Sequence, residues 1–105
     1  MTKKKIKIPI YNQSIVVIIT EEENPRYKAF VDYVDGCITA LFVKKHLSDG
    51  IIVHECVHLV NFLYSHIGAE LDINNDEHQA YLTQYIYEQI KKIINNGIKQ
   101  MVLQG

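Results

Sequence analysis

The sequence predicts an α+β fold, in which a small and mostly antiparallel sheet from the N-terminal half packs with two long helices. Short β-prone runs rich in Val and Ile fill much of residues 5–43, and a nearly continuous apolar run follows from Ile51. A second apolar pattern with helical spacing begins near residue 76. The chain has 105 residues, which suits one domain with a modest core, so we expect a single domain over residues 1–105.

A hairpin opens the predicted sheet. Residues 5–10 alternate charged and apolar side chains, and residues 14–20 are rich in Val and Ile. The loop between these two strands is expected at residues 11–13. Pro9 favours an edge position for the first strand, because proline has no amide hydrogen to donate to a neighbouring strand.

A second hairpin is expected after the polar segment 21–25. Residues 27–34 and 37–43 are both β-prone, and Asp35-Gly36 between them is typical of a two-residue hairpin turn. For residues 27–34 the alternative is a helix that begins near Pro25.

The first helix is expected to follow directly. Ser48-Asp49-Gly50 offers an N-cap, with Asp49 the favoured capping residue, and Gly68 offers a C-terminal stop. The run that begins at Ile51 is apolar almost all round, which is typical of a buried helix.

The second helix is expected over residues 76–96, with Asn74 or Asn75 as its N-cap and Gly97 at its end. Apolar side chains at helical spacing form a stripe that we expect to lie in the core: Leu82, Ile86, Ile90 and Ile93.

Within the first helix lies the pentapeptide His54-Glu55-Cys56-Val57-His58. Residues four apart lie on the same helical face, so the two imidazoles could share one tetrahedral zinc ion. Glu55 is placed to deprotonate a zinc-bound water, which makes it the predicted general base. Two buried histidines held by hydrogen bonds are the alternative. Two imidazoles and a carboxylate in one buried turn would be costly without a metal or several partners, which favours zinc.

A catalytic zinc keeps three protein ligands and leaves one position for water, so a third ligand is required. The residues considered all follow the motif: His66, Glu70, Asp72, Asp76, Glu77 and His78. We favour Glu77, because it shares a helical face with the small Ala80, which would let that face approach the zinc helix. His78 and Asp76 stay open as ligands, and acids at this helix start could also serve only the helix dipole.

His-Glu-x-x-His followed by Glu77 in Glu77-His78-Gln79-Ala80-Tyr81 resembles the gluzincin metallopeptidases. The short chain is most similar to minimal phage- or prophage-borne zincins and to the ImmA/IrrE-type proteases that cleave phage repressors. The resemblance covers about residues 49–94. The chain departs from larger gluzincins in two ways, because it lacks their Asn-Glu-x-x-Ser-Asp segment and a separate substrate-binding domain.

The resemblance implies a zincin-like fold, in which residues 37–43 would form the strand at the edge of the active-site cleft. A peptide substrate could then add as a further strand to that edge. Zinc and one side-chain donor would stabilise the tetrahedral oxyanion, with Tyr81 the predicted donor. The alternative donors are Tyr85, Tyr64 and His66.

The composition sets bounds on partners and location. A formal charge of −1 gives no case for nucleic-acid binding, and the Lys3-Lys4-Lys5 cluster is too short to change this. No stretch approaches the roughly 20 apolar residues of a membrane span, and residues 12–14 interrupt any signal peptide. Cys37 and Cys56 are expected to be reduced, buried thiols. We therefore expect a protein of the bacterial or phage-infected cytoplasm.

These patterns together predict a zinc-dependent metallopeptidase that acts on a peptide or protein substrate. The alternative is a binding or regulatory protein with a zincin fold, in which zinc is structural or lost. Helix faces rich in Ile and Tyr suit a dimer interface as well as a core, so the sequence leaves the oligomeric state undefined.

Overall fold

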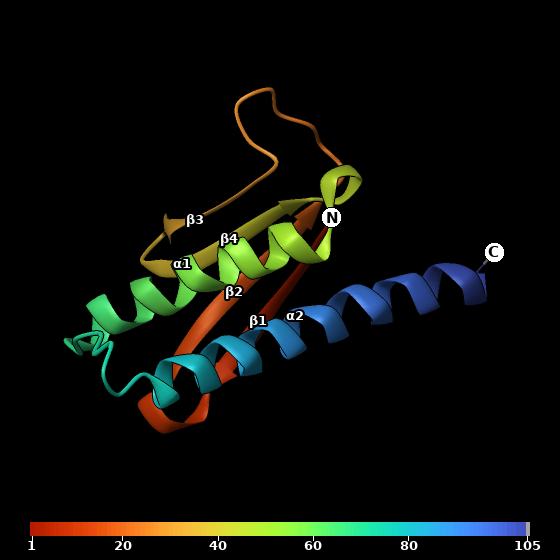
Figure 1. The fold of residues 1–105 in the computed structure, drawn as a ribbon. Coiled ribbons are helices and arrows are strands. Elements are labelled where there is room, and N and C mark those ends of the chain that lie inside the picture. Colours follow the sequence, from red (N-terminus) through yellow and green to blue (C-terminus); the bar gives the residue numbers. More distant parts are fainter. Residues whose placement is uncertain (105) are drawn as a thin grey trace.

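Four strands and two helices make up the fold in the computed structural model (Figure 1). The structure describes the backbone of residues 1–104 and the side chains of residues 1–9 and 11–97. Both helices lie on one face of the sheet, which confirms the predicted α+β class. In chain order the elements are β1 (Thr2–Ile8), the 3₁₀ turn η1 (Pro9–Tyr11), β2 (Gln13–Thr20), β3 (Ala29–Val34), β4 (Cys37–Val43), the 3₁₀ turn η2 (Lys44–His46), α1 (Asp49–Ile67) and α2 (Glu77–Gln104).

The sheet is mixed, with the strand order β1-β2-β4-β3. β1 pairs antiparallel with β2, and β3 pairs antiparallel with β4, whereas β2 and β4 run parallel. The expectation of a mostly antiparallel sheet therefore holds for the two hairpins. The parallel pairing arises because the segment after β2 crosses to the outer edge before the chain returns as β4.

The two hairpins have the backbone that their turns predict. Asp35 and Gly36 both have positive φ, at 53° and 81°, as a type I′ turn requires. Residues 27–34 therefore contribute a strand and not a helix. Pro9 begins η1 directly after β1, and β1 is an edge strand as predicted. The predicted loop at residues 11–13 is correct only in part, because Gln13 already belongs to β2.

The prediction that residues 37–43 form an exposed sheet edge is wrong, because β4 lies between β2 and β3. Burial explains the difference. The side chains of Ala40 and Phe42 are fully buried, and such a nearly continuous apolar run suits an interior strand. The free edge is β3, where Asp32 and Tyr33 are exposed to solvent.

One hydrophobic core fills the space between the sheet and the helices. α1 lies against β3, β4 and α2, and α2 lies against β1 and α1. The predicted stripe of α2 enters this core, with Leu82, Ile86 and Ile90 buried and Ile93 partly buried.

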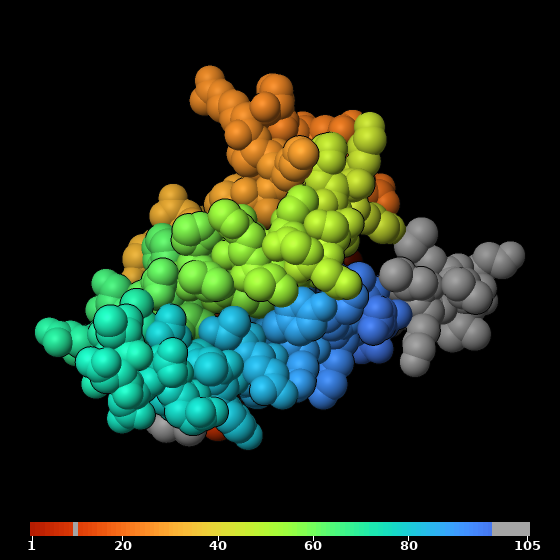
Figure 2. All heavy atoms as spheres, viewed as in Figure 1, coloured from red at the N-terminus to blue at the C-terminus, as the bar shows by residue number. Residues whose placement is uncertain are grey.

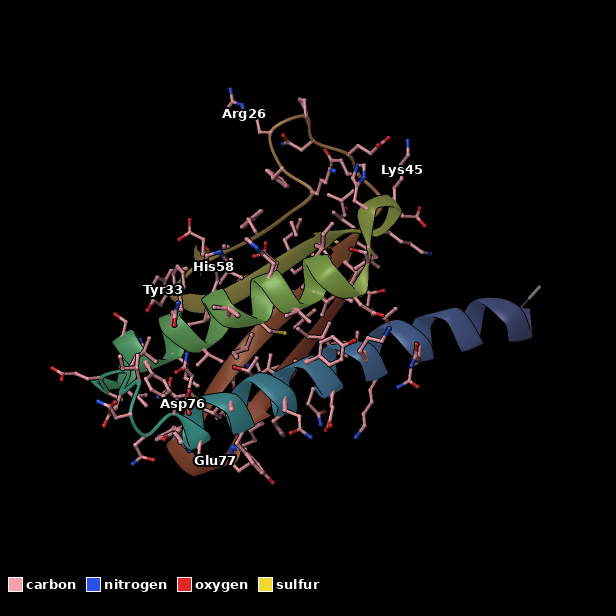
Figure 3. The ribbon with its side chains drawn as sticks, viewed as in Figure 1. Arg26, Tyr33, Lys45, His58, Asp76 and Glu77 are labelled. Carbon is pink, nitrogen blue, oxygen red and sulfur yellow. The ribbon has the colours of Figure 1, made fainter. Side chains whose placement is uncertain are left out.

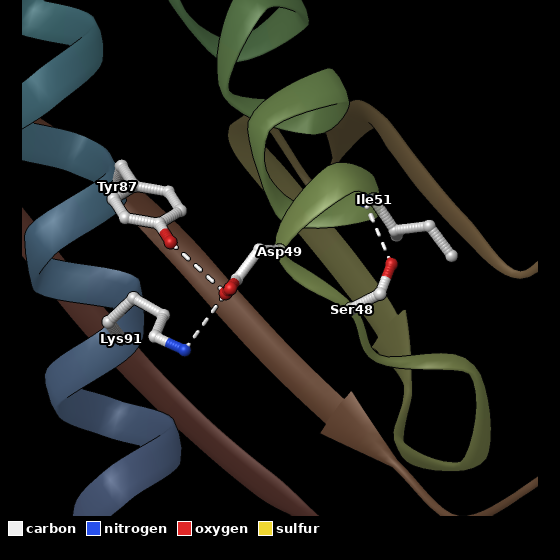
Figure 4. Close-up of polar contacts among 5 residues, drawn as sticks. All are labelled: Ser48, Asp49, Ile51, Tyr87 and Lys91. Carbon is white, nitrogen blue, oxygen red and sulfur yellow. Dashed lines mark hydrogen bonds and ion pairs between the residues drawn. The ribbon is translucent and has the colours of Figure 1, made fainter.

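The N-cap of α1 is Ser48, whose hydroxyl accepts a hydrogen bond from the amide of Ile51, so the expected cap Asp49 is wrong (Figure 4). Asp49 has another role. Its Oδ1 accepts hydrogen bonds from the Tyr87 hydroxyl at 3.1 Å and from Lys91 Nζ at 3.0 Å, which tie the start of α1 to α2. The bonds from Lys91 and Tyr87 lower the pKa of Asp49. Gly68 ends α1 in the left-handed conformation, as predicted.

α2 differs from its prediction at both ends. Its first residue is Glu77, and the amide of Ala80 donates to the carbonyl of Asp76, so neither Asn74 nor Asn75 is the N-cap. The helix also continues through Gly97 to Gln104. A glycine inside a helix costs only about 1 kcal/mol relative to alanine, and no proline follows to stop the helix.

The two cysteines are free, but only one is buried. Cys56 is fully enclosed in the core, as expected, whereas Cys37 begins β4 beside the turn and is exposed, so its predicted burial is wrong. Over the described part of the chain, neither helix has the length and apolar content that crossing a membrane requires.

Candidate functional site

His54 and His58 lie one turn apart on the exposed side of α1. Their Nε2 atoms are 3.2 Å apart, and their rings stand edge to face at 73°. Two nitrogens that bind one tetrahedral zinc at about 2.0–2.1 Å would be about 3.3 Å apart. The two imidazoles therefore converge at the spacing that two positions of such a zinc ion require.

Glu55 is buried, with only 6% of its surface exposed. Its carboxylate makes no hydrogen bond or ion pair with any described residue, although burying an unpaired carboxylate is costly. No fully enclosed polar side-chain atom among the described residues lacks a partner, so this carboxylate must reach open space. That space is a pocket of about 360 Å³ that Glu55 and His54 both line.

This pocket lies where α1 begins beside the start of β3. Gly50 and Ile51 line it from the helix, and Lys28 and Ala29 line it from the strand side. The Glu55 carboxylate and the His54 imidazole thus line one opening that a small group could enter.

The pocket forms a groove between α1 and the free edge of the sheet at the start of β3. The far end of β3 carries Tyr33, whose hydroxyl donates to the carbonyl of Phe62 at 3.4 Å and whose ring lies 5.0 Å from the Phe62 ring. The Tyr33 ring also lies 6.2 Å from that of His66. β3 and α1 therefore run side by side, and Figure 3 shows Tyr33 and His58 on the same side of α1. Because β3 is an edge strand, its outer backbone groups are available to pair with another strand.

The structure does not bring Glu77 to the imidazoles. Glu77 is exposed at the first residue of α2, and Figure 3 places it across α1 from His58. Asp76 and Val53 both line a separate pocket of about 460 Å³ between the two helices. Within the described part of the chain, no group of three or more His, Cys, Asp or Glu residues could hold a metal ion.

His78 has partners elsewhere. Its Nε2 is hydrogen-bonded to the hydroxyl of Tyr11, and its ring stacks on Tyr64 at 6.1 Å between centroids. His78 therefore joins η1, α1 and the start of α2, at a distance from the pocket that Glu55 lines.

The predicted oxyanion donor Tyr81 lies on α2 with 69% of its surface exposed, and it does not line the pocket. The alternatives Tyr85 and Tyr64 are also engaged elsewhere, since Tyr85 donates to the carbonyl of Lys7 and Tyr64 stacks on His78. Of the four donors considered from the sequence, His66 is the one beside the edge strand, through its contact with Tyr33.

The thiol of Cys56 takes no part in the site. Burial, with the nearby charge of Glu55, raises the pKa of Cys56 to about 12. The thiol therefore stays protonated at neutral pH, and a protonated thiol is neither a metal ligand nor a nucleophile.

Sequence reasoning missed Lys28 and Tyr33, which lie at the two ends of β3. The Asp35-Gly36 turn could have placed Tyr33 on the same face as Val31, because side chains alternate along a strand. No local pattern in the sequence predicts that Lys28 lies beside α1, because this proximity depends on the order of the strands in the sheet.

No protein-family model, no curated protein and no solved structure matches this chain. The site consists of two converging imidazoles, a buried carboxylate without a partner among the described residues, and a free strand edge beside them.

Proposed function

We propose that this protein is a zinc-dependent metallopeptidase, with His54 and His58 as zinc ligands and Glu55 as the general base. One observation carries the proposal. The buried carboxylate of Glu55 has no partner among the described residues, and it opens into a pocket shared with His54, whose Nε2 converges with that of His58. A protein retains such a costly arrangement where the carboxylate has a chemical task.

Glu77 stays the predicted third ligand, and His78 and Asp76 stay its alternatives. Glu77 is exposed, and its side chain has no hydrogen bond or ion pair among the described residues. A Glu77→Ala variant tests this assignment by its zinc affinity. Zinc retained at wild-type affinity would move the third ligand to His78 or Asp76.

Each of the proposed site residues has a separate role in the reaction. Zinc, when bound, supplies a Lewis acid that lowers the pKa of water towards neutrality. Glu55 would accept a proton from the attacking water as the water oxygen bonds to the peptide carbonyl carbon. It would then pass this proton to the amine nitrogen, which leaves as the carbon–nitrogen bond breaks. Tyr81 is the predicted donor to the oxyanion. His66 is the alternative donor, and its position beside the edge strand supports that alternative.

The substrate is a peptide or a protein segment in extended form. The free edge of β3 supports this, because an extended peptide can pair with an edge strand through backbone hydrogen bonds. In this proposal β3 is the peptide-binding edge strand, a role that the sequence analysis assigned to residues 37–43. The formal charge of −1 gives no case for a nucleic-acid substrate. The likeness to minimal phage-type zincins supports a role in the bacterial or phage-infected cytoplasm.

A Glu55→Gln variant tests the proposed chemistry. We expect it to retain zinc but to lose peptide cleavage by at least about 100-fold, because the amide cannot accept the proton. Glu88→Gln, an exposed change on α2, is the matched control and should cleave like the wild type. Cleavage by Glu55→Gln at the wild-type rate would refute the mechanism. Binding of peptides without cleavage by the zinc-loaded wild type would favour a zincin-fold binding protein.

A further inference from the structure

A second pocket, of about 600 Å³, adjoins the candidate site on the side of the β2–β3 connection. Residues 23–28 and His46 of η2 line it, and Lys28 lines both this pocket and the one that contains His54 and Glu55. Figure 2 shows the connection (orange) standing above the start of α1 (yellow-green). A group bound at Lys28 would therefore lie at the end of the proposed peptide groove.

The basic side chains of the second pocket outnumber the acidic ones. Arg26, Lys28 and His46 line it together with the carboxylate of Glu23. That carboxylate is already engaged, since its Oε1 lies 3.3 Å from Lys45 Nζ and 3.8 Å from His46 Nε2. Neither Arg26 nor Lys28 forms an ion pair with a described carboxylate. The pocket therefore presents two cations that pair with no carboxylate of the described residues.

The backbone holds Lys28 in place. Its carbonyl accepts a hydrogen bond of 3.0 Å from the amide of Val43 at the end of β4, directly before the pairing of Ala29 with Phe42. The preceding turn is closed by the amide of Tyr27, which donates to the carbonyl of Asn24, and by Asn24 Oδ1, which accepts from the amide of Arg26. The Lys28 side chain thus extends from a fixed point beside the groove.

The two ends of β3 differ in chemistry. Lys28 and Arg26 lie at the end where β3 begins, whereas Tyr33 and Phe62 form an aromatic surface at the other end. A peptide paired along β3 rises by about 3.3 Å per residue, so both ends are within reach of a segment of a few residues.

We propose that Lys28 binds a carboxylate of the peptide, so that the substrate carries an acidic side chain or its C-terminal carboxylate beside the start of β3. This inference rests on the proposed function in one respect, which is that the bound peptide is a substrate. The carboxylate site itself stands on Lys28, which forms no ion pair with a described carboxylate, and on the two pockets that it lines.

The experiment uses a mixture of proteome-derived peptides with the zinc-loaded full chain, and mass spectrometry reads the residues around each cleaved bond. We expect acidic residues to be enriched about tenfold at one fixed position, which corresponds to one charge-assisted hydrogen bond. Lys28→Glu should reverse this preference towards Lys and Arg, and Lys28→Met should abolish it. Lys5→Glu makes the same charge change on the far edge strand and should leave the preference intact.

A peptide-binding experiment distinguishes a failure of this proposal from a failure of the proposed function. Glu55→Gln and Glu55→Gln/Lys28→Glu are immobilised, and the retained peptides are identified with free and with amidated C-termini. Acid-selective retention that Lys28→Glu abolishes supports the carboxylate site even where no cleavage occurs. Loss of retention on amidation identifies the C-terminal carboxylate as the ligand, and retention after amidation identifies an acidic side chain. Cleavage or retention without a preference for acids, or a preference that survives Lys28→Glu, would overturn the proposal.

Discussion

The Nε2 atoms of His54 and His58 lie 3.2 Å apart on successive turns of α1 and point to one place outside the helix. Their convergence follows from the spacing of four residues, which puts both side chains on one helical face. Glu55 follows His54 directly and so lies on a different face of α1. Its carboxylate is therefore buried, while the two imidazoles are exposed. The pentapeptide therefore holds two converging imidazoles and a buried carboxylate on a single helix.

Replacing either imidazole should remove metal binding. His58→Ala leaves one imidazole of the convergent pair, so we expect its zinc affinity to fall by at least about 100-fold, measured by competition with a chromogenic chelator. His66→Ala is the matched control, because His66 is an exposed histidine two turns further along α1. Equal affinities in the two variants would refute the assignment of His58.

Ser48→Ala should destabilise the helix that carries the site. Loss of the hydroxyl that accepts from the Ile51 amide costs about 1 kcal/mol in the free energy of unfolding, measured by urea denaturation. Ser65→Ala, an exposed change near the other end of α1, serves as the control. Ser48→Asp should retain most of the stability, since aspartate also caps helices. An unchanged unfolding midpoint in Ser48→Ala would contradict the assigned cap.

The contact of Asp49 with Lys91 and Tyr87 should make stability depend on pH. The pKa of Asp49 is lowered in the folded protein, so its contribution is complete above the unfolded value of about 3.9 and is lost as the pH falls through the folded value. Melting curves of the wild type and Asp49→Asn should therefore differ at pH 7 and converge in acid. Glu70→Gln, which removes an exposed carboxylate without a partner among the described residues, should match the wild type throughout.

The two thiols should react very differently. Cys37 is exposed, whereas Cys56 is fully buried with its pKa raised to about 12. A thiol-specific chromogenic disulfide at pH 8 should therefore modify one cysteine per native chain, and the second only after denaturation. Cys37→Ser should abolish the native reaction. Rapid modification of both cysteines in the native wild type would show that Cys56 is accessible.

Local patterns predicted the elements well. The alternation in the first strand, the Asp35-Gly36 turn and the stop at Gly68 are each set by a few neighbouring residues, and the structure has them. The spacing of His54 and His58 belongs to the same class, because one helical turn fixes it. The misplaced caps and the helix that continues through Gly97 are differences of a few residues or one turn, where packing decides between nearly equal choices.

The arrangement of these elements could not be predicted in the same way. Both β3 and β4 are β-prone, and the choice of which of them pairs with β2 depends on burial over the whole sheet. That choice moved the free edge to β3 and brought Lys28 beside the pocket. The position of Glu77 also depends on how α2 packs, and no spacing along the chain specifies it.

The most direct test of the account is the zinc content of the purified wild-type chain, measured by elemental mass spectrometry after reconstitution and removal of free metal. The account predicts about one zinc ion per chain, as a single site of this kind binds one ion. A chain that holds no zinc after reconstitution would contradict the assignment of His54, Glu55 and His58 as a metallopeptidase centre.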